Sequence, residues 1–228
     1  MPRITKWFSK LSGMMMAMQL DYRVLGNMLS GAVEIIREKN DELSRLDAVI
    51  GDGDHGVTML RAMEKIGEIL ASQPEGSIST TLGDIAWALM GIDGGATGPL
   101  YGSLFLGMSD ATAGKEALTA QDFAQMMESG LTSLQQQTKA QIGDKTLLDA
   151  LIPAVQALRQ AADQGDDIPV MLQKAAGAAM QGAESTRQYP AKFGRAKFQG
   201  ERTIGHMDPG SVSLAYIFQG FYNSLVYG

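Results

Sequence analysis

The sequence predicts an all-α protein, built as an antiparallel bundle or barrel of eight helices. Apolar residues recur at helical spacing through most of the chain, and strand-like alternation is hard to find. Most joints between the helical stretches are short, which makes consecutive helices antiparallel neighbours. The eight stretches are 21–39, 58–72, 80–91, 99–113, 120–138, 145–163, 167–187 and 210–226.

Start signals mark two of the first four stretches. Asp21 can accept a hydrogen bond from the first turn of 21–39. Pro99 suits the opening turn of 99–113, where its missing N–H leaves no donor unpaired. The two stretches between them carry the same apolar stripe, so we expect helices there as well.

Two of the last four stretches also have start signals. Thr119, followed three residues later by Asp122, predicts a capped start for 120–138. Asp208-Pro209 predicts the start of 210–226, since Asp is a favoured N-cap and Pro a favoured first helical residue.

The stretch 145–163 has the clearest periodicity. Pro153 lies inside it and predicts a kink, because proline cannot donate the helical hydrogen bond. Its buried stripe is expected to consist of Leu147, Leu148, Leu151, Ile152, Val155 and Leu158.

Composition excludes several classes of protein. The chain has 228 residues, no cysteine and two histidines, which excludes disulfide scaffolds, thiolate zinc sites and cysteine nucleophiles. Its 19 basic and 25 acidic residues give a net charge of −6, which argues against a nucleic-acid partner. There is no apolar run of about 18 residues, as a membrane-spanning helix would need. We therefore expect a cytoplasmic protein with one domain over residues 20–228.

Residues 1–19 are expected to form a loosely ordered N-terminal extension. Three basic residues and no acidic residue precede the apolar run LSGMMMAMQL, which gives the segment a resemblance to a signal peptide. However, Ser12 and Gly13 interrupt that run, and no clear A-x-A cleavage site follows. A start of translation at Met14–Met16 is the other explanation of this segment.

Three joints do not resemble ordinary connections. They are Asp47–Thr58, Gly91–Ser103 and Ala191–Gly210, and all three are rich in glycine and charged or polar residues. Helical bundles place their functional sites in such loops at the helix ends. We therefore expect one site, assembled from all three joints.

The first joint contains GDGDHG, which matches G-x-G-x-x-G in letters only. A dinucleotide site needs a preceding strand and bare amides, whereas here aspartates would repel the phosphates. An EF-hand is excluded too, because the twelfth position counted from Asp52 is Met63 instead of Glu. The remaining interpretation is that Asp47, Asp52 and Asp54 converge on a divalent cation that also binds phosphate. The alternative is a solvated acidic turn with helix caps.

The second and third joints offer partners for a phosphate. Gly94 to Gly98 precede Pro99, so backbone amides at a helix N-terminus could hold an anion, or the small residues could only permit a tight turn. The segment GDKT at 143–146 is not a P-loop, because the preceding glycine pattern is absent. The third joint carries five basic residues, most of them expected in solvent: Lys192, Arg195, Lys197, Arg202 and His206.

Taken in order, LDAVIGDGDHG, GGATGPLYG, GDKT and GRAKFQGERTIGHMDPGS resemble the L subunit of dihydroxyacetone kinase. The resemblance covers roughly residues 20 to 226. There are departures: the family often has Asn at Thr58, and members can carry Gly at Thr138 and Met at Leu147. A β-branched residue at position 138 weakens the expected contact with the adenine edge.

The resemblance implies an eight-helix antiparallel barrel that binds ADP or ATP at one end through two Mg²⁺ ions. It implies that Asp47, Asp52 and Asp54 are the metal ligands and that Arg195 is the catalytic residue, reaching the phosphates from the closing loop. The nucleotide-binding positions it implies are His55, Gly56, Val57, Thr58, Ala96, Thr97, Thr138, Leu147, Arg195, Asp208, Pro209 and Gly210.

The resemblance also implies partners. In that family the ketose is bound covalently to a histidine of a separate K subunit, so the isolated chain should not phosphorylate dihydroxyacetone. The phosphate donor is either ATP or a phosphohistidine protein of the phosphotransferase system, and some L subunits bind a transcriptional regulator. Two other functions stay open: a nucleotide-sensing regulatory module that does not catalyse transfer, and a metal-dependent phosphohydrolase.

Overall fold

The computed structural model describes residues 18–93 and 95–227. The first seventeen residues of the expected extension therefore lie outside the described residues, as does Gly94. The helices are α2 (Tyr22–Ile50), α3 (His55–Ser72), α4 (Ile78–Met90), α5 (Thr97–Ala111), α6 (Ala120–Gln135), α7 (Leu148–Asp163), α8 (Ile168–Ser185) and α9 (Pro209–Val226). Two 3₁₀ segments, η1 (Thr186–Gln188) and η2 (Ala196–Thr203), and two short strands, β1 (Leu20–Asp21) and β2 (Ala117–Leu118), complete the described part.

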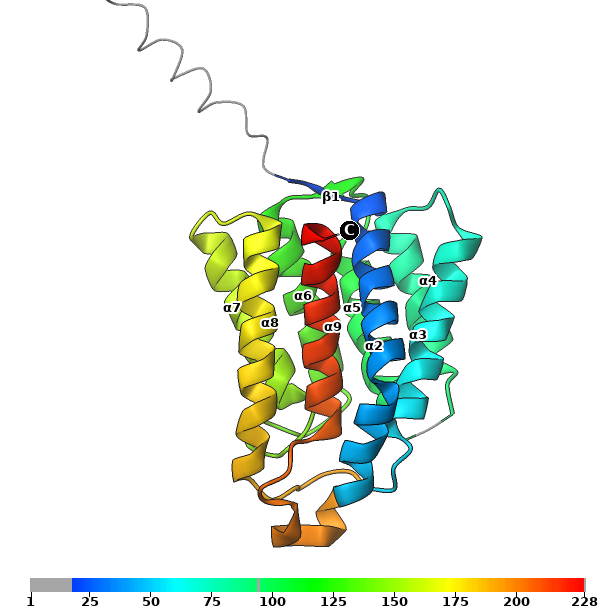
Figure 1. Cartoon of the computed structure of the whole chain (residues 1–228). Helices are drawn as coiled ribbons and strands as arrows, with labels where there is room; N and C mark the ends of the chain where they lie inside the picture. The colour runs from blue at the N-terminus through cyan, green and yellow to red at the C-terminus, as the bar shows by residue number, and fades with distance from the viewer. Residues whose placement is uncertain (1–17, 94, 228) are drawn as a thin grey trace, which may run out of the picture.

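The eight α-helices form a closed ring. Each packs against the helices before and after it in the chain, and α9 packs against α2, which closes the ring (Figure 1). The hydroxyl of Tyr216 on α9 donates to Glu42 Oε1 on α2 at 2.7 Å across this closure. The apolar stripes face inward, and one hydrophobic core extends from Leu20 to Phe221. The predicted antiparallel eight-helix barrel is confirmed.

The predicted start signals act as helix caps. Asp21 Oδ1 accepts from the amide of Val24 at 2.8 Å at the start of α2. Thr119 and Asp122 form a reciprocal capping box at the start of α6. Asp208 Oδ2 accepts from the amide of Ser211 at 2.7 Å, with proline at the first position of α9.

Most helix boundaries differ from the prediction by one to three residues, α3 beginning at His55 and α6 ending at Gln135, and the largest difference is at the end of α2. Helix α2 continues to Ile50 instead of ending at residue 39, because Leu43, Asp47 and Ile50 continue its buried face through a mostly polar segment. The first joint therefore shortens to residues 51–54. Helix α5 begins at Thr97, before the proline that was expected to open it. Helix α7 begins at Leu148 and runs through Pro153 to Asp163 without ending there.

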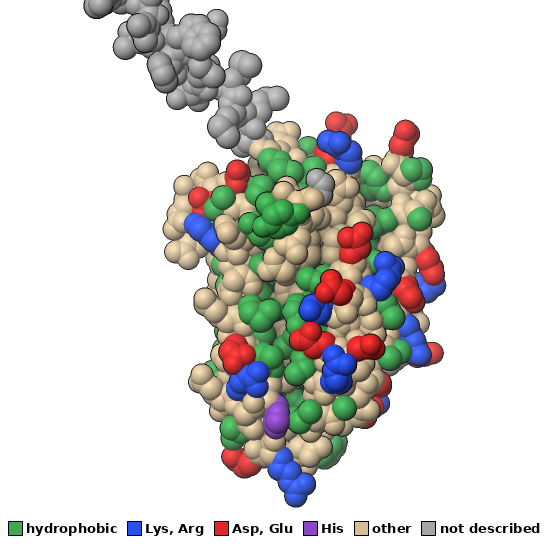
Figure 2. Space-filling view, in the orientation of Figure 1, with side chains coloured by type: hydrophobic (Ala, Val, Ile, Leu, Met, Phe, Trp, Pro, Cys, Tyr) green, Lys and Arg blue, Asp and Glu red, His purple; other side chains and the backbone are tan. Residues whose placement is uncertain are grey.

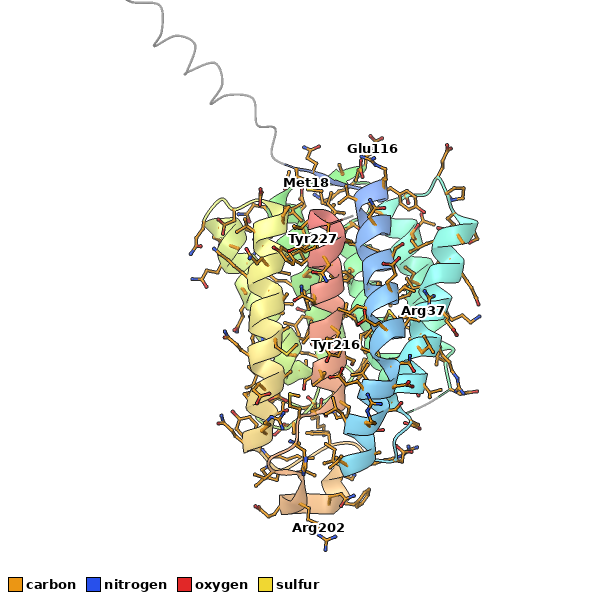
Figure 3. All side chains as sticks on the ribbon, in the orientation of Figure 1. Met18, Arg37, Glu116, Arg202, Tyr216 and Tyr227 are labelled. Carbon is orange, nitrogen blue, oxygen red and sulfur yellow. The ribbon has the colours of Figure 1, made fainter. Side chains whose placement is uncertain are left out.

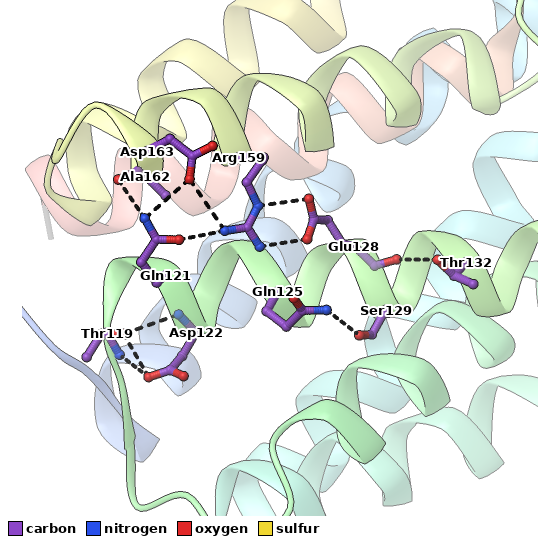
Figure 4. A network of polar contacts seen from close by, with 10 residues as sticks. All are labelled: Thr119, Gln121, Asp122, Gln125, Glu128, Ser129, Thr132, Arg159, Ala162 and Asp163. Atoms are coloured by element: carbon purple, nitrogen blue, oxygen red, sulfur yellow. Dashed lines mark hydrogen bonds and ion pairs between the residues drawn. The ribbon is translucent and has the colours of Figure 1, made fainter.

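A polar network joins α6 to α7 (Figure 4). The Arg159 guanidinium donates to both carboxylate oxygens of Glu128, at 2.9 and 2.6 Å, and to Gln121 Oε1 at 2.6 Å. Gln121 in turn donates to the carbonyl of Ala162 at 2.9 Å. These contacts are geometrically specific, and they fix the register of two helices near the outer surface of the barrel.

The two ends of the barrel are different. Glu116 and Tyr227 lie at the end that holds the β1–β2 pair, whereas Arg202 projects from η2 at the other end (Figure 3). On the face shown in Figure 2, acidic and basic side chains are interspersed. No helix within 18–93 and 95–227 is both long and apolar enough to cross a bilayer.

Candidate functional site

Four joints meet at the η2 end of the barrel (Figure 1). In an up-and-down ring every second joint lies at the same end, and here these are 51–54, 91–96, 136–147 and 186–208. They surround a pocket of about 350 Å³. Its lining is Asp47, Ile50, Gly51, Asp52, Asp54, His55, Thr58, Gly95, Ala96, Thr97, Leu100, Tyr101, Gln137, Thr138, Ala140, Lys145, Thr146, Leu147, Leu148, Phe193, Gly194, Arg195, Ala196, Asp208, Pro209 and Gly210.

The three aspartates lie together at one side of this pocket. One carboxylate oxygen from each of Asp47, Asp52 and Asp54 lies within 4.8 Å of the other two. Asp47 is buried in the last turn of α2, whereas Asp52 and Asp54 are exposed on the following turn. Converging hard oxygen donors with open positions toward a pocket fit a divalent cation such as Mg²⁺.

The glycines of GDGDHG hold the Asp47 carboxylate in place. Its Oδ2 accepts from the amides of Gly53 at 3.0 Å and His55 at 3.1 Å. A Cβ on Gly51 would lie 2.1 Å from Asp47 Oδ1, so a side chain there would displace the carboxylate. Gly53 has φ +82°, a left-handed conformation that other residues rarely adopt. These glycines therefore serve the carboxylate cluster.

His55 lies under the carboxylates in the first turn of α3. Its Nε2 is 3.0 Å from Ser213 Oγ on α9. Burial lowers the pKa of His55, and this outweighs the opposing effects of the Asp47 charge and a hydrogen bond to the Pro209 carbonyl. The contact between the neutral imidazole and Ser213 thus connects the start of α3 to α9.

The residues after His55 divide between the pocket and the helix packing. Thr58 is buried and lines the pocket. Gly56 packs against α2, where a Cβ would lie 1.9 Å from the carbonyl oxygen of Asn40. Val57 is 44% exposed. Neither Gly56 nor Val57 lines the pocket, so any contact with a ligand would have to use their first-turn amides.

The N-terminus of α5 lines the same pocket as the carboxylates. Ala96 is the N-cap and its side chain can accept no hydrogen bond, so the first-turn amides have no side-chain cap. Ala96 and Thr97 both line the pocket. Unpaired amides and the positive end of a helix dipole make an anion site. The predicted phosphate-binding segment therefore has the required geometry.

Arg195 reaches the carboxylate cluster from the joint between α8 and α9. Its Nη1 lies 3.1 Å from Asp54 Oδ2 and forms an ion pair with Asp52 as well. The prediction placed this side chain on phosphate, and the structure places it on two of the three carboxylates. Arg195 nevertheless lines the pocket, which is where a bound phosphate would also lie.

The other basic side chains of this joint have separate partners. Lys192 forms an ion pair with Asp144 at 2.7 Å, and its hydrogen bond holds the pKa of Asp144 below the usual value. Lys197 lies 4.9 Å from the centre of the Phe198 ring. Arg202 is exposed at the tip of η2 (Figure 3). None of these three basic side chains lines the pocket.

A further wall of the pocket comes from the α6–α7 joint and the start of α7. Thr138 lines it, with its hydroxyl accepting from the amide of Ala140 at 3.1 Å. Leu147 lies beside Gly210, and Phe193 adds an aromatic face. Thr138 and Leu147, which the resemblance implied as nucleotide-binding positions, thus belong to a largely apolar wall.

The resemblance implied that the segment 138–147 lines the nucleotide site, but it gave no role of its own to Lys145, which lines the pocket. Its side chain is 2% exposed, and its ammonium donates to the carbonyls of Thr186 and His206, which join the α6–α7 joint to the closing segment. Burial lowers the pKa of Lys145, opposed by the charges of Asp208 and Asp149. The one available signal was its motif, GDKT, which is not a P-loop and which contributed only to the family resemblance. The imidazole of His206 is exposed and does not line the pocket.

The resemblance implied only that Asp208 borders the nucleotide, but the structure also gives its carboxyl group an unusual pKa. Burial raises the pKa of Asp208 to about 7, and the Asp149 charge adds to this, whereas Lys145 and the Ser211 amide oppose it. The residue keeps some exposure to the pocket, but protein surrounds its carboxylate on the other sides. A carboxyl group in such an environment is a mark of functional sites.

Comparisons with known proteins agree with this geometry. Residues 49–223 match the model of the DAK2 domain family. The chain is 36% identical over 202 residues to the PEP-dependent dihydroxyacetone kinase, ADP-binding subunit DhaL, of Escherichia coli, covering 89% of this chain and 96% of that protein. It is 38% identical over 186 residues to the PTS-dependent counterpart of Lactococcus lactis, covering 82% and 88%.

Solved structures give a similar result. The dihydroxyacetone kinase of C. freundii in its native form has a TM-score of 0.71 and 27% identity. The same kinase in complex with AMP-PNP and Mg²⁺ has a TM-score of 0.68 and 26% identity. The chain spans 34% of the first of these longer chains, whereas 89% of its own length is covered.

Proposed function

This chain belongs to the DAK2 domain family, and we propose that it is the nucleotide-binding, phosphoryl-transferring subunit of a dihydroxyacetone-type kinase. The single observation that carries this proposal is the convergence of three carboxylates on a pocket that is also lined by the N-terminus of α5. This arrangement suits a nucleotide whose phosphates are bridged to the protein by metal ions.

The carboxylate cluster of Asp47, Asp52 and Asp54 would hold two Mg²⁺ ions. Bound there, the metal supplies neutralisation of the charge on the phosphates. The protein would fix the positions of these ligands. Two backbone amides donate to the Asp47 carboxylate, and Gly51 leaves the space that this carboxylate occupies. The first turn of α5 would bind the phosphate oxygens through its amides and Thr97.

Arg195 would change partners during the reaction. It now pairs with Asp52 and Asp54, and a metal-bound nucleotide would release it to a phosphate, for which its fork of donors is suited. Phosphoryl transfer depends mainly on positioning and on stabilising charge in the transition state. We therefore assign Arg195 the catalytic role and the apolar wall around Leu147 the binding of adenine.

A separate K subunit that holds the ketose would dock over the mouth of the pocket. Five large apolar side chains are exposed on the segments that frame this end: Val49, Val57, Ile142, Phe198 and Ile204. Phe198 alone is 83% exposed. Exposed apolar residues around a polar site are typical of an interface that excludes water when the partner arrives.

The donor we propose is a phosphohistidine protein of the phosphotransferase system, with ADP as a standing cofactor. Three relatives that align with this chain over nearly their whole length support this choice, because they are named PEP- or PTS-dependent. With a K subunit and dihydroxyacetone, phosphoenolpyruvate and the phosphotransferase proteins should give turnover. Turnover with excess ATP alone at an equal rate would contradict this choice of donor.

Calorimetric titration of ADP into the nucleotide-stripped protein tests the site. Binding should require Mg²⁺ and should be lost in Asp52→Asn. Binding that ignores both the metal and the substitution would refute the proposal, because the aspartates would then be only helix caps. Release of phosphate from ATP without any partner would instead favour a phosphohydrolase.

Substitution of Arg195 by alanine separates a transferase from a nucleotide sensor. For a transferase, turnover with the K subunit should fall by about a hundredfold or more, while ADP affinity changes by less than about tenfold. Arg202→Ala is the matched control, since Arg202 lies in the same segment and outside the pocket. Unchanged turnover in the Arg195 variant would support the regulatory module.

A further inference from the structure

Tyr101 occupies an unusual position on α5. It lies one helical turn after Thr97, so both side chains share the face that lines the pocket. The residue is only 3% exposed. Among the described residues, the Tyr101 hydroxyl is the only buried side-chain nitrogen or oxygen with no hydrogen-bond partner. Buried hydroxyls are nearly always paired, so this atom requires an explanation.

The neighbouring protein groups do not provide one. The hydroxyl of Ser213 is close enough to act as a weak hydrogen-bonding neighbour that lowers the pKa of Tyr101, but it donates to the carbonyl of Gly210 at 2.9 Å and lies 3.0 Å from His55 Nε2. No hydrogen bond of acceptable geometry joins it to Tyr101. Burial, aided by the Asp208 charge, raises the pKa of Tyr101 above its ordinary value. The phenol thus remains a proton donor at all physiological pH values.

We propose that the Tyr101 hydroxyl donates a hydrogen bond to a phosphate oxygen of the bound nucleotide, which makes Tyr101 a further nucleotide-binding residue. This inference rests on the proposed function. A phosphate is favoured because Tyr101 lies on the same face as Thr97, directly inside the helix end that attracts anions. A hydrogen bond from a neutral hydroxyl to a charged phosphate oxygen is stronger than a hydrogen bond from the same hydroxyl to a neutral oxygen.

The substitution Tyr101→Phe tests this, because it removes only an atom that the nucleotide-free protein leaves unpaired. The affinity for ADP with Mg²⁺, measured by calorimetry, should fall roughly tenfold or more. The thermal midpoint of the nucleotide-free protein should stay unchanged or rise. Tyr216→Phe is the matched control, since its hydroxyl bonds Glu42 outside the pocket. That variant should lose thermal stability and keep its ADP affinity.

Other outcomes would overturn the inference in distinguishable ways. An unchanged ADP affinity in Tyr101→Phe would show that Ser213 or a water is the partner, and a lower thermal midpoint would identify Ser213. The analogues 2′-deoxy-ADP and 3′-deoxy-ADP each lack one ribose hydroxyl. If one of them bound the wild type and Tyr101→Phe with equal affinity, the partner of Tyr101 would be the missing ribose hydroxyl instead of a phosphate. Failure of the wild-type protein to bind ADP with Mg²⁺ would overturn the proposed function and this inference together.

Discussion

Adding one methyl group at Gly51 should disable the metal site without removing any carboxylate. A Cβ there would lie 2.1 Å from Asp47 Oδ1, whereas ordinary contact begins at 3.4 Å. The carboxylate would have to move by about 1.3 Å. Metal–oxygen distances tolerate only about 0.2 Å, so Gly51→Ala should cost one of the three protein ligands. We expect ADP affinity in the presence of Mg²⁺ to fall at least tenfold, or about 1.4 kcal/mol.

Calorimetry with ADP at several Mg²⁺ concentrations measures this effect, and Gly26→Ala provides the control. Gly26 lies on the same helix as Asp47, and a Cβ there would meet nothing within 4 Å. That change should leave ADP binding intact and raise stability by up to about 1 kcal/mol, since alanine is the better helix former. If Gly51→Ala bound ADP as the wild type does, Asp47 would not be a metal ligand and the account of GDGDHG would be wrong.

Two further predictions concern the buried charges beside the pocket. Lys145→Met would leave the carbonyls of Thr186 and His206 without their donor, so chemical denaturation should show a loss of about 1–3 kcal/mol. Asp208 has a folded pKa of about 7 and an ordinary value of 3.8, so the folded state keeps a proton that the unfolded chain loses. Its contribution to unfolding free energy should therefore fall by about 1 kcal/mol per pH unit as pH rises from about 4 to 7. Asp208→Asn should flatten that slope in denaturation curves, and an identical slope in the variant would contradict the elevated pKa.

Most of the fold could be predicted from local sequence patterns, because the apolar stripe of a helix and its N-cap each depend on residues that are close together in the sequence. Each apolar stripe has one buried face, and each cap satisfies amides only three residues away, as Asp21 and Thr119 do. The extension of α2 was missed because the segment after residue 39 is mainly polar. Its helical face shows only when Asp47 is counted as a buried residue between Leu43 and Ile50. A carboxylate that serves a site is therefore what concealed the end of the helix.

The candidate site was predictable where its residues are neighbours in sequence. Three aspartates within eight positions favoured a cluster over the alternative of a solvated acidic turn, and their carboxylates do converge in the structure. Lys145 and Tyr101 could not be found in this way. Lys145 acquires its role from carbonyls 41 and 61 residues away, and the unpaired hydroxyl of Tyr101 is a property of the assembled pocket.

The charges around the pocket would also select the form of nucleotide that can bind in the proposed site. Three carboxylates would repel a bare polyphosphate, so the phosphates need accompanying cations to approach them. Arg195 now supplies part of that positive charge through Asp52 and Asp54, and it comes from the joint that closes over the pocket. In the proposed site, Asp52 and Asp54 would hold the metal that neutralises the phosphates, and Arg195 would then be free to donate to a phosphate oxygen. Binding of the metal–nucleotide complex and the change of partner by Arg195 would thus be coupled, because the same aspartates would take part in both.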